Sequence, residues 1–502
     1  ETGASGESHG AWMMGEELIL AVDAGTGDCR VIAFSLDGAV RYIAKHEWIY
    51  EKAEGNVFTF DARRCWAEIF GMLKETVSHL PGCCVMAVTT ASQRDGMVFL
   101  DCRDREVYCA PNMDLRGAEV LDELQPFRTE ILTRTGLPIS ALFGLPRMVY
   151  LRKHSPEVYA DIRCVMMLCD WIAWRLSGEK RSERAAASSS QMLNLEQGEY
   201  DTELMQRLGL HTDIFPRCSA GTEVIGQLRP EIAAELGISY PVPVLIGGGD
   251  TQCGAVGMKA LRPGDVGAVG GTTTPVLAVL DHPHVDRDGH VYTACSALKN
   301  QWILESCADS TGLSLRWVRN LFLTPEASFA DMEAEAMQVQ PGCDGMSAYI
   351  GVGIRDEDRG LNWGGFCFPV PWNVSDYTRA HFFRSAFETN AFGVMANLEV
   401  LQRKGIALPE QLHVCGGQSH SGLWPQILAD TVQIPVQTYQ TTECTALGAA
   451  AMAAFGTGVY RSLTEAVSAF SAEGTLYRPD AGSPYPEIYA AWLRLHRHMI
   501  AF

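Results

Sequence analysis

The sequence predicts an α/β protein built from two related halves. Short apolar runs typical of buried strands alternate along the chain with longer segments of helical spacing, a pattern typical of α/β architectures. Two strand–turn–strand units with glycine and threonine at the turn begin about 245 residues apart, which indicates an internal duplication. A chain of 502 residues is long enough for two large domains.

In the first half, Leu18–Val22 predicts a strand that runs into a glycine turn at Asp23–Gly27, and Val31–Phe34 predicts the return strand. Further strands are expected at Cys84–Thr90 and Val242–Ile246. The last of these strands leads directly into three glycines and an aspartate. The first half is therefore expected to present two glycine loops at strand ends.

The second half repeats this order. Asp265–Val269 and Val276–Leu280 predict a hairpin around Gly270–Thr274, and Leu412–Cys415 predicts a strand that leads into two glycines. Helices are expected at Ala160–Leu176, Ala386–Leu401, Leu423–Thr431 and Thr445–Phe455. The last helix consists largely of alanine and glycine, which suits close packing against a neighbour or a ligand.

These patterns suggest a division of the chain. Residues 1–15 are small and polar and are expected to be a tag or a disordered lead-in. Residues 16–257 are expected to form an N-terminal domain, and residues 258–502 a C-terminal domain. The boundary follows the last glycine loop of the first half, and no low-complexity linker marks it.

Composition restricts the function. The chain has 40 Lys and Arg against 60 Asp and Glu, a net charge of −20, which repels nucleic acid and anionic lipid at long range. We therefore expect no nucleic-acid and no membrane partner.

The 16 cysteines are scattered, without metal-ligand spacing or a dense disulfide framework. They predict buried thiols in a cytoplasmic protein.

Four glycine-bearing loops follow predicted strands, at Asp23–Gly27, Gly247–Asp250, Gly270–Thr273 and Gly416–Gly422. Glycine lets backbone N–H groups approach an anion closely, and threonine adds hydroxyl donors. Four such loops indicate a polyphosphate ligand. The sequence contains neither G-x-x-x-x-G-K-[ST] nor G-x-G-x-x-G, which argues against a P-loop or a Rossmann site.

Two carboxylates stand at these strand ends. Asp23 lies beside a phosphate loop, where it would repel phosphate unless a divalent cation such as Mg²⁺ lies between them. Asp250 follows three glycines, where a carboxylate can orient an alcohol and accept its proton. Each residue could instead be a turn aspartate that caps a backbone N–H.

With these motifs the chain resembles the FGGY carbohydrate kinases, which share the actin-like ATPase (ribonuclease H-like) fold with hexokinase and the heat-shock ATPases. The resemblance covers roughly residues 16–480. It is carried by Leu20–Gly27 with Arg30, Ser92–Gly96, Gly247–Asp250, Gly270–Thr273, Ser310–Trp317, Gly416–Trp424 and Glu443–Gly448. It implies two lobes of duplicated domains around a central cleft, with ATP and Mg²⁺ used to phosphorylate a small sugar or polyol. Family members are often dimers, so the resemblance also allows a homodimer.

The resemblance implies a role for each matching residue. Asp250 would be the general base, and Asp23 would hold Mg²⁺ directly or through water, with Asp250 beside it. Substrate contacts are expected from Gln93, Arg94, Asp95, Asp114 and Asp250. Nucleotide contacts are expected from Thr26, Arg30, Gly271, Thr272, Thr273, Gly312, Arg316, Gly416, Gly417, Gln418 and Ser421. Trp317 and Trp424 are expected to pack behind the nucleotide pocket.

The sequence departs from the family pattern at two places. Gln418 stands where the adenosine loop has its third glycine, and His420 stands where lysine is frequent, which leaves the nucleotide preference open. Gly353–Asp358 replaces a loop rich in Gly, Glu and Arg that many sugar kinases carry. This second departure weakens an assignment to xylulose or gluconate.

Within the family the chain is most similar to the autoinducer-2 kinases, which phosphorylate the linear form of that quorum-sensing signal, dihydroxypentanedione. The similarity lies in Pro111–Arg116, Cys169–Ala173 and Ser310–Trp317. The dione is therefore the expected substrate, and a pentulose or polyol such as xylulose or ribulose is the alternative. A sensor that binds nucleotide or sugar without catalysis is a more remote alternative.

Overall fold

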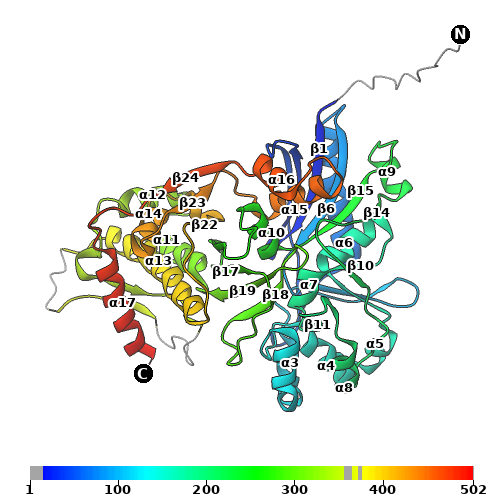
Figure 1. Ribbon diagram of the computed structural model, residues 1–502, viewed down its shortest axis with the longest axis horizontal. Coiled ribbons are helices and arrows are strands. Elements are labelled where there is room, and N and C mark those ends of the chain that lie inside the picture. Colours follow the sequence, from blue (N-terminus) through cyan, green and yellow to red (C-terminus); the bar gives the residue numbers. More distant parts are fainter. Residues whose placement is uncertain (1–14, 356–363, 371–375, 501–502) are drawn as a thin grey trace, which may run out of the picture.

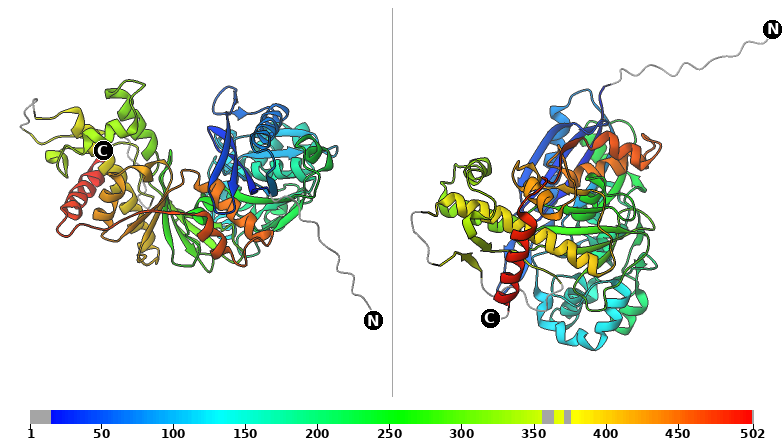
Figure 2. Two further views of the ribbon diagram at one scale, coloured as in Figure 1. Left: turned by 90° about the horizontal axis from the view of Figure 1, so that it is seen from above. Right: turned by 60° about the vertical axis from the view of Figure 1, so that its left-hand side comes forward.

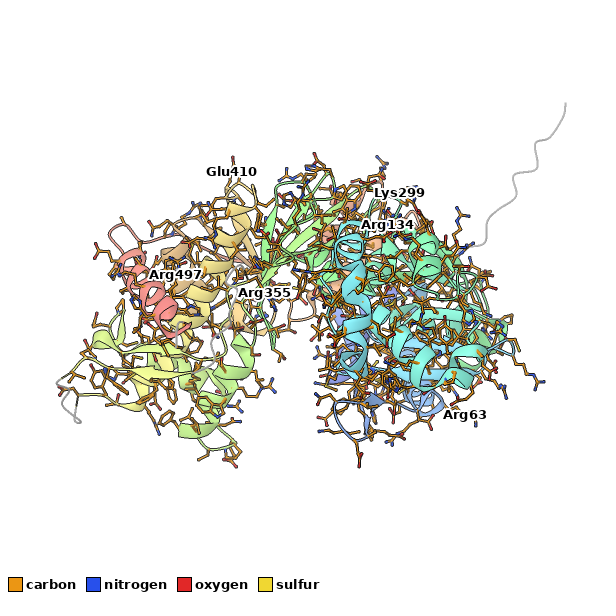
Figure 3. The ribbon with its side chains drawn as sticks, turned by 90° about the horizontal axis from the view of Figure 1, so that it is seen from below. Arg63, Arg134, Lys299, Arg355, Glu410 and Arg497 are labelled. Carbon is orange, nitrogen blue, oxygen red and sulfur yellow. The ribbon has the colours of Figure 1, made fainter. Side chains whose placement is uncertain are left out.

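The computed structural model describes residues 15–355, 364–370 and 376–500. These residues form two lobes that meet on one side of the molecule and stand apart on the other (Figures 1 and 3). Within the described ranges, no helix is both long and apolar enough to cross a membrane. Residues 1–14 of the expected lead-in and residues 356–358 of the Gly353–Asp358 loop lie outside these ranges.

The N-terminal lobe is built on a six-stranded mixed sheet. Three strands form an antiparallel meander, and two further strands run parallel to the first of them. The carboxyl ends of these parallel strands therefore meet at one edge of the sheet. In spatial order the strands are β14 (Val224–Gln227), β15 (Pro243–Gly249), β6 (Cys84–Ser92), β1 (Glu17–Ala24), β2 (Asp28–Ser35) and β3 (Val40–Glu47).

The C-terminal lobe is built on a seven-stranded sheet with the same core. Again, three antiparallel strands precede two strands that run parallel to the first. In spatial order the strands are β18 (Tyr292–Cys295), β19 (Trp302–Cys307), β17 (Pro275–Leu280), β16 (Val266–Val269), β22 (Leu412–Cys415), β23 (Val436–Tyr439) and β24 (Glu473–Tyr477).

The two sheets share one topology. The order β3-β2-β1-β6-β15 of the first sheet matches β19-β17-β16-β22-β23 of the second. In each lobe a long helix lies between the third antiparallel strand and the first parallel one: α1 (Ala62–His79) and α13 (Arg379–Arg403). This correspondence confirms the duplicated α/β fold that the two glycine hairpins predicted.

Two short helices join the lobes at their contact. α10 (Asp250–Gly257) packs against α15 (Cys444–Gly456), and α15 also covers one face of the N-terminal sheet. α15 and α16 (Leu463–Phe470), coloured orange, lie beside the blue strands of that sheet (Figure 2). A Cβ added at Gly448 would lie 2.0 Å from the carbonyl oxygen of Cys253. Glycine at this position thus permits the close helix contact that the small-residue pattern predicted.

One helix prediction was wrong in part. The segment expected to be helical at 160–176 contains the end of α5 (Pro156–Asp161), then β9 (Cys164–Met167) and α6 (Leu168–Ser177). β9 is fully buried and pairs with β7 (Met97–Leu100). A short strand buried on both faces has no polar alternation, so its sequence cannot be distinguished from a buried helix.

The remaining elements surround the two sheets. In the N-terminal lobe they are β4 (Glu51–Lys52), β5 (Phe58–Thr59), β8 (Glu106–Ala110), α2 (Leu121–Leu124), α3 (Arg128–Thr135), α4 (Gly144–His154), β10 (Arg181–Glu183), α7 (Arg184–Ser189), β11 (Leu193–Asn194), β12 (Glu199–Tyr200), α8 (Thr202–Arg207), β13 (Arg217–Ser219) and α9 (Pro230–Glu235). In the C-terminal lobe they are α11 (Thr311–Phe322), α12 (Phe329–Ala336), β20 (Ser347–Tyr349), β21 (Gly365–Cys367), α14 (Trp424–Val432) and α17 (Tyr485–Ile500). Among the described residues, 3₁₀ turns occupy Arg116–Val120, Gln125–Phe127, Cys343–Gly345 and Gly417–His420.

Candidate active site

Three cavities lie where the glycine loops of the two lobes come together. The Asp95 cavity has a volume of about 670 Å³ and is lined by residues of both lobes. The Asp23 cavity has a volume of about 600 Å³ and is also lined from both lobes. The Phe387 cavity, of about 470 Å³, lies within the C-terminal lobe.

These cavities share parts of their walls. Thr272, on the glycine loop after β16, lines all three. Thr26 and Asp250 line both the Asp95 and the Asp23 cavity. Arg316 of α11 lines both the Asp23 and the Phe387 cavity. The three cavities therefore form a row, with the Asp23 cavity in the middle.

Asp250 stands at the junction of β15 and α10. Gly248, the penultimate residue of the strand, has a φ of +126°, and a Cβ there would lie 2.5 Å from Glu183 Oε2. Only glycine can readily adopt this backbone conformation. The Asp250 carboxylate accepts a 2.7 Å hydrogen bond from the Thr251 N–H. Burial raises the pKa of Asp250, and the nearby Arg94 guanidinium opposes that rise.

Asp23, the penultimate residue of β1, lines the Asp23 cavity together with Asp250. Its Oδ1 is buried and has no hydrogen-bond partner among the described residues. Burial, reinforced by the charge of Asp250, raises the pKa of Asp23 to about 7. An unpartnered carboxylate oxygen in such surroundings fits a hard divalent cation such as Mg²⁺, which prefers oxygen ligands.

The protein supplies few ligands for such a cation. In the part of the chain that the structure describes, no group of three or more His, Cys, Asp or Glu side chains is arranged to hold a metal ion. Mg²⁺ commonly takes one or two carboxylates and completes its shell with water and phosphate oxygens, and Asp23 and Asp250 are two carboxylates that line one cavity.

The loop after β6 lines the Asp95 cavity. Asp95 has a φ of +63°, and its buried Oδ1 has no hydrogen-bond partner among the described residues. Burial raises the pKa of Asp95 to about 7, against the lowering effect of Arg147 and Arg94. The fully buried Arg147 donates a 2.5 Å hydrogen bond to the Asp95 carbonyl oxygen and so fixes the loop. The loop therefore holds Asp95 in a conformation rare for non-glycine residues, with an unused acceptor beside the cavity.

Gln93 and Asp114, expected from the sequence to contact substrate, do not line the Asp95 cavity. The Gln93 amide donates to the Gly25 carbonyl at 3.1 Å. The Asp114 carboxylate is fully buried and accepts hydrogen bonds from Tyr108 at 2.8 Å and Arg116 at 2.7 Å. Both side chains hold neighbouring loops in place in this structure, and their contact with substrate stays a prediction.

The residues expected to contact nucleotide are brought together. Every one of them lines at least one of the three cavities: Thr26, Arg30, Gly271, Thr272, Thr273, Gly312, Arg316, Gly416, Gly417, Gln418 and Ser421. They come from the loops after β1, β16 and β22, from β2 and from the first turns of α11. Residues almost 400 positions apart thus meet because the duplicated sheets place their glycine loops face to face.

Comparison with known proteins decides the family. The model of the FGGY carbohydrate kinase N-terminal domain matches residues 18–257, and that of the C-terminal domain matches residues 266–457. The chain belongs to the FGGY family of carbohydrate kinases. It is therefore a phosphotransferase that acts on a sugar, and the two-lobed actin-like fold is confirmed.

Two curated relatives of this FGGY kinase carry the same name. It is 27% identical to "Autoinducer-2 kinase" of Photorhabdus laumondii over 469 residues, which is 89% of this chain and 87% of the relative. It is 28% identical to "Autoinducer-2 kinase" of Escherichia coli K12 over 471 residues, again 89% and 87% of the two chains.

Solved structures agree in fold. The xylulose kinase of Rhodospirillum rubrum superposes with a TM-score of 0.83 at 23% identity, over 96% of this chain and 99% of that one. The glycerol kinase of Plasmodium falciparum with ADP gives a TM-score of 0.85 at 15% identity, over 97% and 99%.

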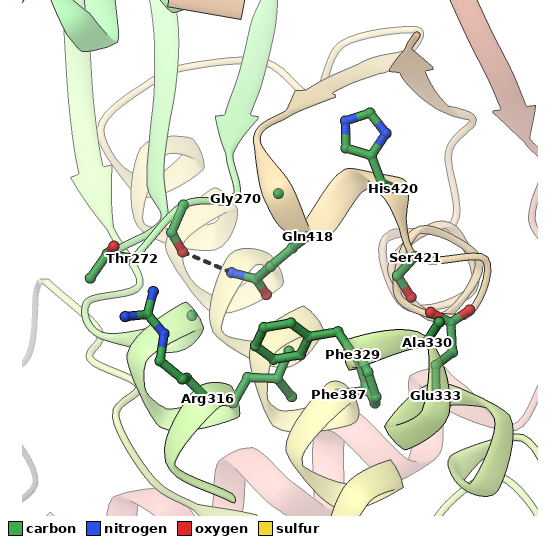
Figure 4. Close-up of a pocket in the computed structure, with 14 residues that line it drawn as sticks. Gly270, Thr272, Arg316, Phe329, Ala330, Glu333, Phe387, Gln418, His420 and Ser421 are labelled. Atoms are coloured by element: carbon green, nitrogen blue, oxygen red, sulfur yellow. Dashed lines mark hydrogen bonds between the residues drawn. The ribbon is translucent and has the colours of Figure 1, made fainter. Parts of the chain in front are cut away.

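The departure at Gln418 has a structural explanation. Its buried side chain donates to the Gly271 carbonyl at 3.3 Å and accepts from Asn390 Nδ2 at 2.9 Å. Gln418 thus joins the loop after β16 to α13, at one side of the Phe387 cavity (Figure 4). His420 is exposed, and its ring points away from the other labelled side chains (Figure 4). Gln418 therefore stabilises the loop after β16 in this FGGY kinase.

Of the two tryptophans expected behind the pocket, only one is there. Trp424 is fully buried beneath the Phe387 cavity, where its ring lies 3.5 Å from a Cβ placed at Gly270. Trp317 is 50% exposed, so that prediction was wrong. Together with Leu313 and Leu321, at a spacing of four residues, Trp317 forms the solvent-facing side of α11, whose other face packs on α13.

Sequence reasoning missed several residues of the site. Arg147 and Glu305 hold the loop after β6, and Asn112 donates a 2.9 Å hydrogen bond to Thr26 Oγ1. Asn112 lies within Pro111–Arg116, one of the stretches that carry the similarity to the autoinducer-2 kinases, so this motif could have pointed to it. Arg147 and Glu305 lie far from any glycine loop in the sequence, and no local pattern marks them.

Proposed function

We propose that this FGGY kinase transfers the γ-phosphoryl group of ATP to a hydroxyl of linear dihydroxypentanedione. The row of cavities carries the proposal. A nucleotide in the Phe387 cavity would extend its phosphates into the Asp23 cavity, and Thr272 lines the whole path. Asp250 stands between the Asp23 and Asp95 cavities, where a phosphoryl group and an acceptor hydroxyl would meet.

Asp250 is the proposed general base. Its side chain is 38% exposed, toward the cavities it lines, and its accepted hydrogen bonds come only from Thr251 among the interactions described. A carboxylate with an unused oxygen at this place can orient the acceptor hydroxyl and take its proton as the phosphoryl group arrives.

Asp23 is the proposed partner of Mg²⁺, with Asp250 beside it. Mg²⁺, when bound, would offset the negative charge that these carboxylates and the phosphates bring together. The backbone N–H of Gly416 and the guanidinium of Arg316 are the proposed donors to phosphate oxygens, because both residues line the Asp23 cavity. Phe387 and Phe329 offer apolar surface for the nucleotide's base in the Phe387 cavity (Figure 4).

The lining of the Asp95 cavity favours the dione. Arg94, Asp95 and Asn112 supply charged and hydrogen-bonding groups, whereas Met113 and Leu142 supply apolar surface. Dihydroxypentanedione has two hydroxyls at one end and a methyl ketone at the other, and so matches a cavity with both kinds of wall. A pentulose carries hydroxyls along its whole length and would leave some of them unpaired against apolar side chains. The name that these two curated relatives share supports the same choice.

A pentulose or polyol remains the alternative substrate, and a sensor without catalysis is less well supported. A sensor needs neither a proton acceptor nor a cation partner. The structure nevertheless places Asp250 and Asp23 around one cavity, each with a carboxylate that the fold does not use up. These two groups are best explained by phosphoryl transfer.

The test is ADP release with Mg²⁺ and ATP across a panel of acceptors: dihydroxypentanedione, D-xylulose, D- and L-ribulose, L-fuculose, gluconate, erythritol and glycerol. We expect kcat/KM for the dione to exceed that for every other acceptor. A higher value for a ketose would keep the kinase and replace the substrate. ATP binding without turnover of any acceptor would contradict the proposed reaction.

A further inference from the structure

Glu305 reaches the proposed sugar site from the opposite lobe. It lies on β19 of the C-terminal sheet, and its side chain is only 7% exposed. The carboxylate accepts two hydrogen bonds from Arg94 of the N-terminal lobe, from Nη1 at 2.7 Å and from Nη2 at 3.1 Å. This is a two-point Arg–carboxylate pair, a geometry that fixes orientation as well as distance.

The pair sets the position of Arg94 relative to Asp250. Arg94 Nε lies 3.9 Å from Asp250 Oδ1, which is too far for a hydrogen bond. The aliphatic part of the Arg94 side chain is confined as well, because it packs closely against Gly249. A Cβ added at Gly249 would lie only 3.0 Å from Arg94 Cγ. The guanidinium is therefore held at the edge of the Asp95 cavity, with its terminal nitrogens turned to Glu305.

Removing the Glu305 charge would change what Arg94 binds. Arg94 is largely buried, and a buried guanidinium that loses its carboxylate is costly unless it finds another. Asp250 is the other carboxylate whose contact with Arg94 the structure records. A direct pair between Arg94 and Asp250 would engage this carboxylate through Oδ1, the oxygen nearest Arg94, and would make the whole group a weaker proton acceptor for the proposed reaction.

We propose that Glu305 is a positioning residue for phosphoryl transfer: it holds Arg94 off Asp250 and so keeps the Asp250 carboxylate available to the acceptor hydroxyl. Because Glu305 and Arg94 belong to different lobes, the sugar site is complete only when the two lobes stand as they do here. This inference rests on the proposed function of Asp250.

The alternative is that Glu305 only stabilises the contact between the two lobes. Such a structural role would affect folding, or the KM values for both ATP and the acceptor, without acting through Arg94. The positioning role instead predicts a fall in kcat, little change in KM for ATP, and dependence on the presence of Arg94.

The experiment compares five forms of the full chain with the best acceptor of the wild type: Glu305→Gln, Glu305→Asp, Arg94→Met, the double variant Arg94→Met/Glu305→Gln, and Glu335→Gln. The last removes a carboxylate from a different two-point Arg–Glu pair, the exposed one with Arg379. Circular dichroism and ATP binding establish that each form is folded.

We expect Glu305→Gln to lower kcat by about 10- to 100-fold, with KM for ATP changed by less than about twofold. Glu305→Asp keeps the charge and should retain more activity than Glu305→Gln, and Glu335→Gln should match the wild type. In the Arg94→Met background, adding Glu305→Gln should cost less than about threefold, because the two residues act through one another.

Three results would overturn the inference: a kcat for Glu305→Gln within about twofold of the wild type, losses that multiply fully in the double variant, or equal losses in kcat for Glu305→Gln and Glu335→Gln. The failure of the proposed function is a different result. In that case the wild type itself would turn over no acceptor of the panel.

Discussion

Arg30 of the N-terminal lobe and Glu443 of the C-terminal lobe form an ion pair of 2.5 Å at the wall of the Asp23 cavity. Arg30 also donates a 2.7 Å hydrogen bond to Asp28. The arginine that the sequence suggested as a phosphate contact is thus held by two carboxylates. A phosphate group that binds Arg30 has to compete with Glu443.

Glu443→Gln should therefore strengthen nucleotide binding. Removing the competing charge frees Arg30, and we expect KM for ATP to fall by about three- to tenfold. Steady-state kinetics at saturating sugar measures it. Glu47→Gln is the matched control, because Glu47 lines the same cavity without a recorded side-chain bond to Arg30. If both variants lower KM equally, the general charge of the cavity and not the Arg30 pair is responsible.

Asp250→Asn should remove the proton acceptor and little else. The amide keeps the shape of the side chain, so we expect kcat to fall by about 10²–10⁴-fold while ATP binding is retained. Turnover is measured by ADP release and binding by calorimetry. Asp104→Asn, in an exposed loop where the residue pairs with Lys180, is the control for a lost carboxylate. Near wild-type turnover by Asp250→Asn would remove Asp250 from the mechanism.

Gly448→Ala should disturb the contact between the lobes. Its Cβ would lie 2.0 Å from the Cys253 carbonyl oxygen, and backbone cannot yield as a flexible side chain can. We expect destabilisation by about 1–3 kcal/mol and lower kcat, measured by thermal unfolding and turnover. Gly71→Ala is the opposite control, because nothing lies within 4 Å of its Cβ on α1, and alanine there should add about 0.5–1 kcal/mol. Equal stability of Gly448→Ala and the wild type would contradict the tight contact.

Two buried acids behind the Asp250 loop should make stability depend on pH. Burial raises the pKa of Asp170 to about 7 and that of Glu183 to about 8. A carboxyl group whose pKa is raised by folding contributes stability below its unfolded pKa and loses it as the pH rises through the folded value. The loss therefore falls between about pH 4 and about pH 8.

Thermal unfolding at about pH 5.5 and about pH 8.5 measures this effect. We expect the wild type to lose a few degrees in Tm toward the higher pH, on the order of 2–4 °C per kcal/mol. Glu183→Gln cannot ionise at this position and should lose less over the same interval. A pH dependence identical to that of the wild type would show that Glu183 does not titrate in this range.

Much of the fold was predictable because its signals are local. A strand such as Leu412–Cys415 was predicted with its observed bounds, since an apolar run that ends in glycines has few other interpretations. The carboxylates of Asp23 and Asp250 were predictable because they too follow local patterns, each standing where an apolar strand meets glycines. Parallel strands bring their carboxyl ends to one edge, so Asp23 and Asp250 had to meet once both strands joined the sheet.

The sequence by itself determined the duplicated α/β order, the glycine loops and the two aspartates that line the Asp23 cavity. Tertiary structure alone decided which polar side chains line the cavities and which hold the fold. The Asp114 carboxylate accepts hydrogen bonds from Arg116 and Tyr108. The Arg94 guanidinium is instead oriented by its bond to Glu305, a residue 211 positions away on the other lobe. The free energy of a buried charge depends on the partners that surround it in space, and adjacency in the chain does not encode those partners.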